Sequence, residues 1–142
     1  MKRLLASRKR LLRVRDVQHN RAVMALSQAR DEASQISNNA RRLAEVREEM
    51  YGKNGLTSGA HLASKRELAG RLERAGRQLD GALYDARRRI DERDAERMLA
   101  DRDREIAERL KDKANAAREA QREARLAALP RYRRMRNKGM EE

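Results

Sequence analysis

The chain has 142 residues, of which 42% are charged and 2% aromatic, and its net charge is +13. It contains no Phe, Trp or Cys, so a large globular core and thiol chemistry are both excluded. Polar, charged chains can remain unfolded. Here regular apolar spacing in an Ala-, Leu- and Arg-rich sequence instead favours a coiled coil, so we expect an all-α fold.

A heptad repeat predicts a first long helix over 1–50. The predicted seam, the stripe that faces the partner helix, consists of His19, Ala22, Leu26, Ala29, Ala33, Ile36, Ala40, Leu43, Arg47 and Met50. Leu5 and Leu12 extend this register towards the start, and Arg8 and Arg15 interrupt it. A spacing of 3.5 residues keeps one stripe against a partner in a left-handed supercoil.

A glycine-containing turn is expected over 51–58. Gly52 and Gly55 can adopt a positive φ at little cost, which ends a helix. Thr57 or Ser58 can then cap the next helix, and Ser64-Lys65-Arg66-Glu67 fits a capping box that offers a later start. We therefore expect the chain to fold back at this point.

A second helix is predicted over 59–129, and Pro130 ends it. Its stripe begins with Leu62, Ala69, Leu72, Leu79, Leu83, Ala86 and Ile90. The pattern weakens around Arg93 and Arg97. We expect a four-residue stutter at Met98 and Leu99, after which the stripe continues through Leu99, Ile106, Leu110, Ala117 and Ala124. The segment 130–142 is expected to be a flexible basic tail.

The expected fold is a long antiparallel two-helix coiled-coil hairpin with an overhanging second helix. At 1.5 Å per residue the first helix spans roughly 70 Å and the second roughly 105 Å. Folding at the turn places Leu5 near residue 105. The remainder of the second helix is then either a docking surface or a solvated helix.

The sequence offers no catalytic constellation. His19 and His61 are the only histidines, and neither has a nucleophile or a metal-ligand cluster beside it. General acid–base catalysis needs a cleft that perturbs pKa values, which two paired helices do not provide. No glycine-rich phosphate-binding motif is present. We expect a non-enzymatic protein with no cofactor, no metal and no small-molecule substrate.

Both ends of the sequence are basic. Residues 1–15 hold seven basic side chains and no acidic one, and residues 131–138 hold a second basic cluster. Such segments can bind an anionic membrane, a partner helix or nucleic acid. The first also resembles a mitochondrial presequence, although its continuing seam favours a structural role. No apolar run reaches the roughly 20 residues that span a bilayer, and no secretory signal peptide is expected, so we expect a cytosolic location.

Two segments carry a resemblance to a known family. Leu11-Leu12-Arg13-Val14-Arg15-Asp16-Val17-Gln18 resembles the opening helix of the flagellar FliJ family, the stalk proteins of the type III export apparatus. The segment Gly55-Leu56-Thr57-Ser58-Gly59, followed by Leu68, Leu72, Glu73 and Ala75, is similar to that family's post-loop segment. The resemblance covers roughly Arg3 to Arg125 in length and layout.

The resemblance implies a non-enzymatic stalk whose partners are a hexameric export ATPase, an export-gate membrane protein and export chaperones. Its place would be cytoplasmic and peripheral at the inner membrane. The ATPase-ring contact candidates are Arg8, Arg10, Arg13, Arg15, Arg104 and Arg109. The export-gate and chaperone docking candidates are Leu43, Val46, Met50, Leu68, Leu72 and Ala75. The family often carries aromatics at several docking positions, where this chain has Val46, Met50 and Leu68.

Two other functions fit the residues. A basic coiled coil can bind nucleic acid through phosphate contacts, although aromatics for base stacking are lacking. A coiled coil can also self-associate through an unpartnered helix face. Binding to duplex without any protein partner would favour the first, and a doubled mass in solution the second.

Overall fold

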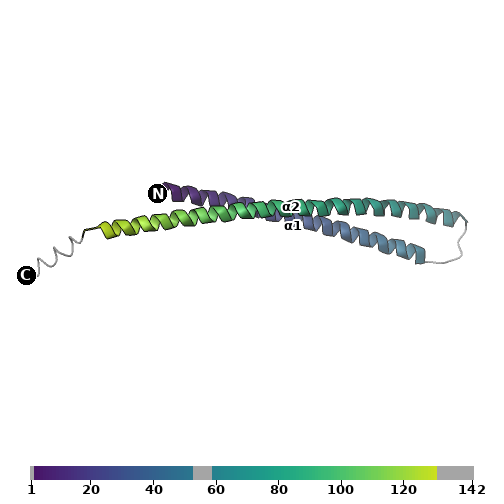
Figure 1. The fold of residues 1–142 in the computed structure, drawn as a ribbon. Coiled ribbons are helices and arrows are strands. Elements are labelled where there is room, and N and C mark those ends of the chain that lie inside the picture. Colours follow the sequence, from purple (N-terminus) through teal and green to yellow (C-terminus); the bar gives the residue numbers. More distant parts are fainter. Residues whose placement is uncertain (1, 53–58, 131–142) are drawn as a thin grey trace, which may run out of the picture. The chain divides into compact units, whose positions relative to one another are not determined.

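The computed structural model describes residues 2–52 and 59–130 and confirms the all-α fold (Figure 1). Helix α1 spans Lys2–Gly52 and helix α2 spans Gly59–Ala128, and no strand occurs within these described ranges. The expected ranges were 1–50 and 59–129. The expected roles of Gly55, Thr57 and Ser58, and the expected flexible tail after Pro130, fall on positions outside the described residues.

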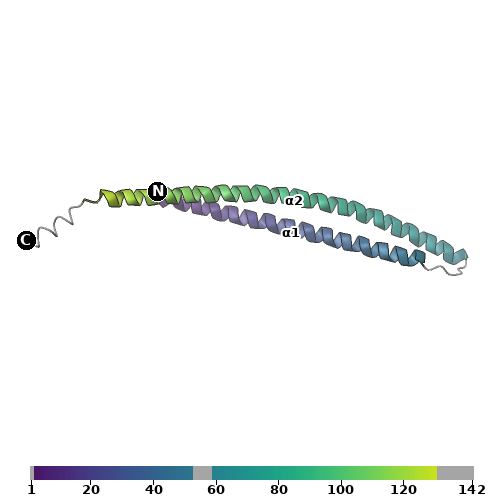
Figure 2. The same ribbon diagram turned by 60° about the horizontal axis from the view of Figure 1, so that its bottom comes forward.

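The chain divides into two units, each made of one segment of α1 and one of α2. In its described part, the terminal unit comprises residues 2–19 and 100–130, and the loop unit comprises 20–52 and 59–99. In each unit the two segments lie side by side and antiparallel (Figures 1 and 2). The expected two-helix hairpin is therefore confirmed.

The seam predicted for α1 is confirmed by burial. The buried residues of α1 are Leu5, Leu26, Ala29 and Ala33, and all four belong to the predicted register. Their spacing combines steps of three, four and whole heptads, so one stripe of α1 faces α2. Alanine occupies half of these positions, which keeps the seam narrow.

Contacts between the helices define their register. In the loop unit, a Leu43 methyl lies 3.7 Å from where a Cβ on Gly76 would be, and Arg47 pairs with Glu73 at 3.9 Å. Because seam positions follow steps of three and four residues, moving ten residues along each helix from the Leu43–Gly76 contact, a heptad plus a step of three, pairs Ala33 with Ala86. Both alanines are buried, which agrees with that register.

The stripe expected for the last part of α2 is wrong. Leu99 and Ile106 are 60% and 55% exposed, whereas Ala107 and Ala114 are buried. These alanines lie three and four heptads beyond Ala86, so the original repeat continues without the expected stutter. The unbroken repeat matches the unbroken seam of α1, and the larger apolar side chains therefore remain outside.

The expected position of Leu5 near residue 105 is also wrong. Leu5 is buried, and the same heptad steps place it opposite Ala114, which is buried too. Met50 correspondingly falls opposite Ala69, so α2 has already run more than two turns from Gly59 before it meets α1. The shift shortens the overhang at this end, since the part of α2 that extends past Lys2, the first residue of α1, begins after residue 117.

The end of α2 follows from proline chemistry. The Leu129 amide donates to the carbonyl oxygens of Arg125 and Leu126, at 3.1 and 3.3 Å. Pro130 has no amide hydrogen to donate, and its ring disfavours a helical conformation at Leu129. The helix therefore stops at Ala128, as Pro130 predicts.

Disulfide formation tests the register directly, because the native chain has no cysteine. We expect the double variant Ala33→Cys, Ala86→Cys to form an intramolecular disulfide under mild oxidation. The control Ala33→Cys, Leu79→Cys displaces one partner by a heptad, about 10 Å along the helix, and should not close. Non-reducing electrophoresis measures both. Equal crosslinking of the two variants would contradict the register.

Leu26 and Met24 provide a matched comparison of seam and surface. Leu26 is 3% exposed and Met24 is 64% exposed. We expect Leu26→Ala to lower the free energy of unfolding by about 2–4 kcal/mol, because it removes buried apolar atoms and leaves a cavity. Met24→Ala should change it by less than about 0.5 kcal/mol. Urea unfolding followed by circular dichroism separates these outcomes, and similar losses would place Leu26 outside the seam.

Candidate functional site

Positive charge is concentrated in the terminal unit. Its described residues contain fifteen lysines and arginines against eight aspartates and glutamates, a net charge of +7. The described residues of the loop unit contain fifteen and thirteen, a net charge of +2. The terminal unit thus carries most of the excess charge, and it attracts anionic partners by a field that salt screens.

Two of the predicted contact arginines bind acidic residues across the helix pair. Arg15 Nη1 lies 3.4 Å from Asp103, and Arg104 Nε lies 3.2 Å from Asp16. Each helix therefore supplies one arginine and one neighbouring aspartate to the other. These side chains are partly exposed, so each pair contributes roughly 0.2–1 kcal/mol. Arg15 and Arg104 are engaged in holding the register.

The other predicted contact arginines are differently placed. Arg8 is half-buried at the seam, whereas Arg10, Arg13 and Arg109 are exposed. None of these four forms an ion pair with another residue that the structure describes. Arg10, Arg13 and Arg109 are consequently available to a partner, while Arg8 lies beneath the helix surface.

The structure contains a cationic depression that the sequence did not predict. It has a volume of about 470 Å³ and is lined by Lys2, Arg118, Gln121, Arg122 and Arg125. Its four cations form no ion pair within the described parts of the chain. The expected register paired the start of α1 with residues near 105, so it separated Lys2 from these arginines. The charge pattern of α2 alone contained no signal that would join them.

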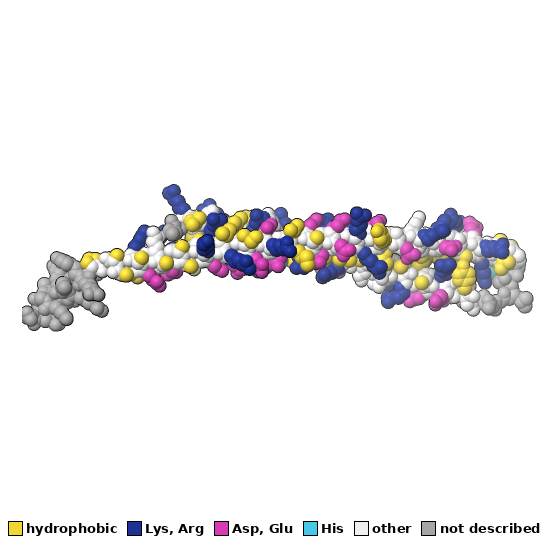
Figure 3. Space-filling view, viewed as in Figure 1, with side chains coloured by type: hydrophobic (Ala, Val, Ile, Leu, Met, Phe, Trp, Pro, Cys, Tyr) yellow, Lys and Arg dark blue, Asp and Glu magenta, His cyan; other side chains and the backbone are white. Residues whose placement is uncertain are grey.

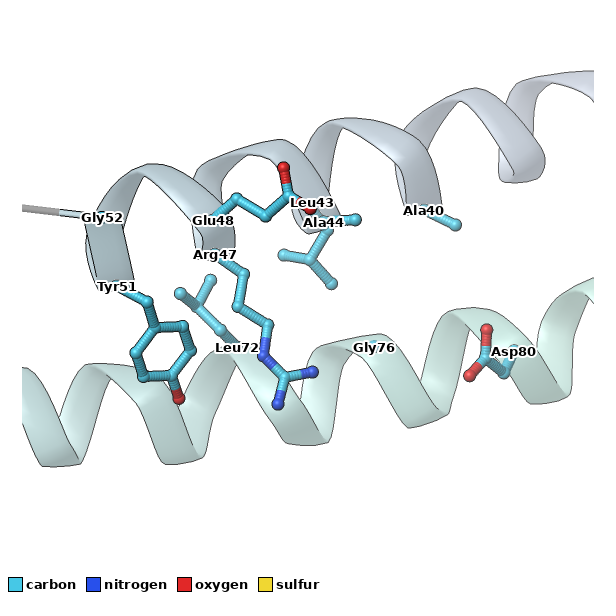
Figure 4. A pocket seen from close by; sticks show the side chains of 10 residues that line it. All are labelled: Ala40, Leu43, Ala44, Arg47, Glu48, Tyr51, Gly52, Leu72, Gly76 and Asp80. Atoms are coloured by element: carbon cyan, nitrogen blue, oxygen red, sulfur yellow. The ribbon is translucent and has the colours of Figure 1, made fainter.

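A groove of about 710 Å³ lies between the helices of the loop unit (Figure 4). Leu43 and Leu72 point into the space between α1 and α2, and Arg47 and Tyr51 reach across it from α1 (Figure 4). The Arg47 guanidinium lies 5.9 Å from the centre of the Tyr51 ring. Gly76 faces this space without a side chain, so the groove is open where a larger residue would close the seam.

Two of the six predicted docking residues line the groove. Leu43 and Leu72 line the groove, while Met50 and Ala75 are half-buried outside its lining. Val46 and Leu68 are 50% and 47% exposed and also lie outside it. The docking candidates did not include Tyr51 and Gly76, which line the groove, because its lining depends on the register of the two helices.

His19 is the one histidine at the seam. Its Nε2 lies 3.5 Å from an Asp101 carboxylate oxygen, and its Nδ1 is buried without a hydrogen-bond partner. No nucleophilic side chain is among these contacts. Across the described ranges, no group of His, Asp and Glu side chains is arranged to hold a metal ion.

No family model, curated protein or solved structure matches the chain. Neither α1 nor α2 includes a stretch long and apolar enough to cross a membrane. The charge, the exposure and the register of the two helices are therefore the features that bear on function.

The cross-helix ion pairs can be tested against a local pair. Glu67 and Arg71, 2.8 Å apart, lie on the same helix. We expect Asp103→Lys to lower the free energy of unfolding by about 1 kcal/mol, because it replaces the partner of Arg15 by a second cation. Glu67→Lys should lower it by only about 0.3–0.5 kcal/mol.

Urea unfolding at low and high salt measures both variants. Adding Arg15→Glu to Asp103→Lys should restore part of the loss by re-forming an opposite-charge pair. Additive effects of the two substitutions on the free energy of unfolding would contradict the contact between Arg15 and Asp103.

Proposed function

We propose that this chain is a non-enzymatic stalk of the flagellar type III protein export apparatus. Its terminal unit would insert into the hexameric export ATPase, promoting assembly of the ring and its turnover. The observation that carries the proposal is the set of unpaired cations in the terminal unit, which has a net charge of +7. The paired-helix fold and the resemblance to FliJ in the sequence support the same role.

The available cations define the surface that would contact the ring. Arg10, Arg13 and Arg109 are exposed, and Lys2, Arg118, Arg122 and Arg125 line the cationic depression. In this role Arg15 and Arg104 maintain the register rather than bind the partner. Contacts between exposed charges are weak and screened by salt. A ring could therefore exchange them readily between its subunits.

The loop unit would link this ring to the export gate and to export chaperones. Leu43 and Leu72 supply an apolar lining to the groove, and the exposed Val46 and Leu68 add apolar surface outside it. Such surfaces suit protein contacts. In this role the chain is cytoplasmic and lies peripherally at the inner membrane.

Nucleic acid is a second candidate, favoured specifically by the cationic depression. Lys2 and the three arginines Arg118, Arg122 and Arg125 could contact consecutive phosphates. Binding of duplex at physiological salt in the absence of any protein would favour this function over the stalk. Steep salt dependence alone does not separate the two, because both are electrostatic.

Turnover of a purified flagellar export ATPase tests the stalk. We expect the full chain to raise ATP hydrolysis and the hexamer fraction. The variant Arg118→Gln, Arg122→Gln, Arg125→Gln should lose most of this stimulation, because it removes three available cations from the terminal unit.

The matched control is Arg30→Gln, Arg41→Gln, Arg42→Gln. It removes three exposed, unpaired arginines from the loop unit and should keep the stimulation. No stimulation and no association by the native chain would reject the stalk. Equal loss in the two triple variants would reject a localised contact and indicate a net-charge effect.

A further inference from the structure

Arg15 marks one side of the terminal unit. Its Nη1 donates to Gln18 at 2.9 Å and to Asp103 at 3.4 Å. Gln18 belongs to α1 and Asp103 to α2, so a single guanidinium group bridges the two helices there. Residues at the same heptad positions as Gln18 and Asp103 must lie along this same side.

Along that side both helices become apolar. One and two heptads before Gln18 are Leu11 and Leu4, and one and two heptads after Asp103 are Leu110 and Ala117. Leu4 is 46% exposed, and the other three are half-buried. The antiparallel register therefore brings these four residues together as a double apolar row.

Two further apolar side chains extend the row outwards. Val14 lies four residues before Gln18, and Ile106 lies three residues after Asp103, so both belong to the helix faces beside the row. They are 52% and 55% exposed. Figure 3 shows hydrophobic side chains gathered along the start of α1 and the adjoining part of α2. We call these six residues the apolar face: Leu4, Leu11, Val14, Ile106, Leu110 and Ala117.

Cations border the apolar face. On α1, Arg10 lies four residues before Val14. On α2, Arg102 and Arg109 lie one turn to either side of Ile106, and Lys113 lies three residues after Leu110. The one carboxylate on this side is Asp103, which Arg15 engages.

The opposite side of the unit carries carboxylates. Asp16 and Asp101 are each two residues before Gln18 and Asp103, which is about 200° around their helices. They bind Arg104 and His19 respectively. Glu108 follows one heptad after Asp101, and Lys9 precedes Asp16 by a heptad. Asp16, Asp101 and Glu108 thus lie on the side of the helix pair away from the apolar face.

We propose that the apolar face binds an amphipathic α-helix of a partner protein, whose apolar stripe is flanked by Glu or Asp. Both rows repeat every seven residues, which is the spacing that a third helix needs to pack along a coiled coil. The flanking arginines and lysine complement acidic residues beside that stripe. This inference concerns the chemistry of the partner segment and holds whether or not that segment belongs to an export ATPase.

Charge argues against a second copy of this chain as the occupant. Two terminal units would bring together faces that are both bordered by arginine and lysine, within units of net charge +7. Like charges across an interface are unfavourable. An anionic membrane would match the cations, but it does not require the matched heptad repeat on two helices.

Titration with a designed peptide tests the face. The probe is a fluorescent helix of about three heptads, with Leu at the two seam positions and Glu beside them. The control peptide has Lys in place of Glu. Fluorescence anisotropy at physiological salt should detect binding of the Glu peptide to the full chain and none of the Lys peptide.

The decisive variant is Val14→Gln, Ile106→Gln, which removes apolar surface without altering charge or the seam. We expect it to weaken binding of the Glu peptide by about tenfold or more. The matched control is Val23→Gln. Val23 is 40% exposed and lies one heptad after Asp16, at the heptad position away from the apolar face. It should bind within about twofold of the native chain.

Three outcomes would overturn the proposal. The first is no binding of the Glu peptide, and the second is equal weakening by the face variant and the Val23→Gln control. The third is that the peptide does not bind, whereas the native chain binds vesicles of phosphatidylcholine and phosphatidylglycerol and the face variant loses this binding. That outcome would assign the face to a membrane. ATPase turnover is read separately, so failure of the stalk leaves this result unaffected.

Discussion

The seam between α1 and α2 is the constraint on which the other features depend. It keeps one heptad register along both helices while offering little apolar bulk. The buried residues of the described chain are two leucines and five alanines, Leu5, Leu26, Ala29, Ala33, Ala86, Ala107 and Ala114. A seam of small residues holds the helices close but offers few bulky side chains that would fix the register. Charged contacts across the helices supply part of the missing discrimination.

Arginine provides that discrimination because its long stem can cover the seam while its guanidinium remains at the edge. Arg15 and Arg104 each reach an aspartate on the opposite helix, and Arg47 reaches Glu73 in the loop unit. A slip by one heptad would separate all three of these pairs. The pairs are individually weak, so each adds only a little to the preference for the native register.

The features that the sequence predicted correctly are those that local sequence determines, namely the heptad repeat of α1 and the end of α2. The seam of α1 was predictable because consecutive heptads carry apolar residues from His19 to Met50, and burial of Leu26, Ala29 and Ala33 follows it. The end of α2 was predictable from Pro130 alone. The last part of α2 was not, because Leu99 and Ile106 are more hydrophobic than the alanines that are buried. The predicted stripe followed the most hydrophobic residues of α2. The buried stripe instead follows the heptad positions that face the seam of α1.

The candidate surfaces were only partly predictable because they depend on how the two helices pair. Cations could be recognised in the sequence, but whether each can bind a partner protein depends on its ion pairs within the chain. Arg104 is paired with Asp16, whereas Arg109 is exposed and forms no ion pair with a described residue. That Lys2 lines one depression together with Arg118, Arg122 and Arg125 follows from the observed register and not from the sequence of either helix alone. Larger apolar residues that the seam does not bury must then lie at the surface, where Val14 and Ile106 flank a repeat shared by both helices. A narrow seam thus creates an apolar surface that only another molecule can cover.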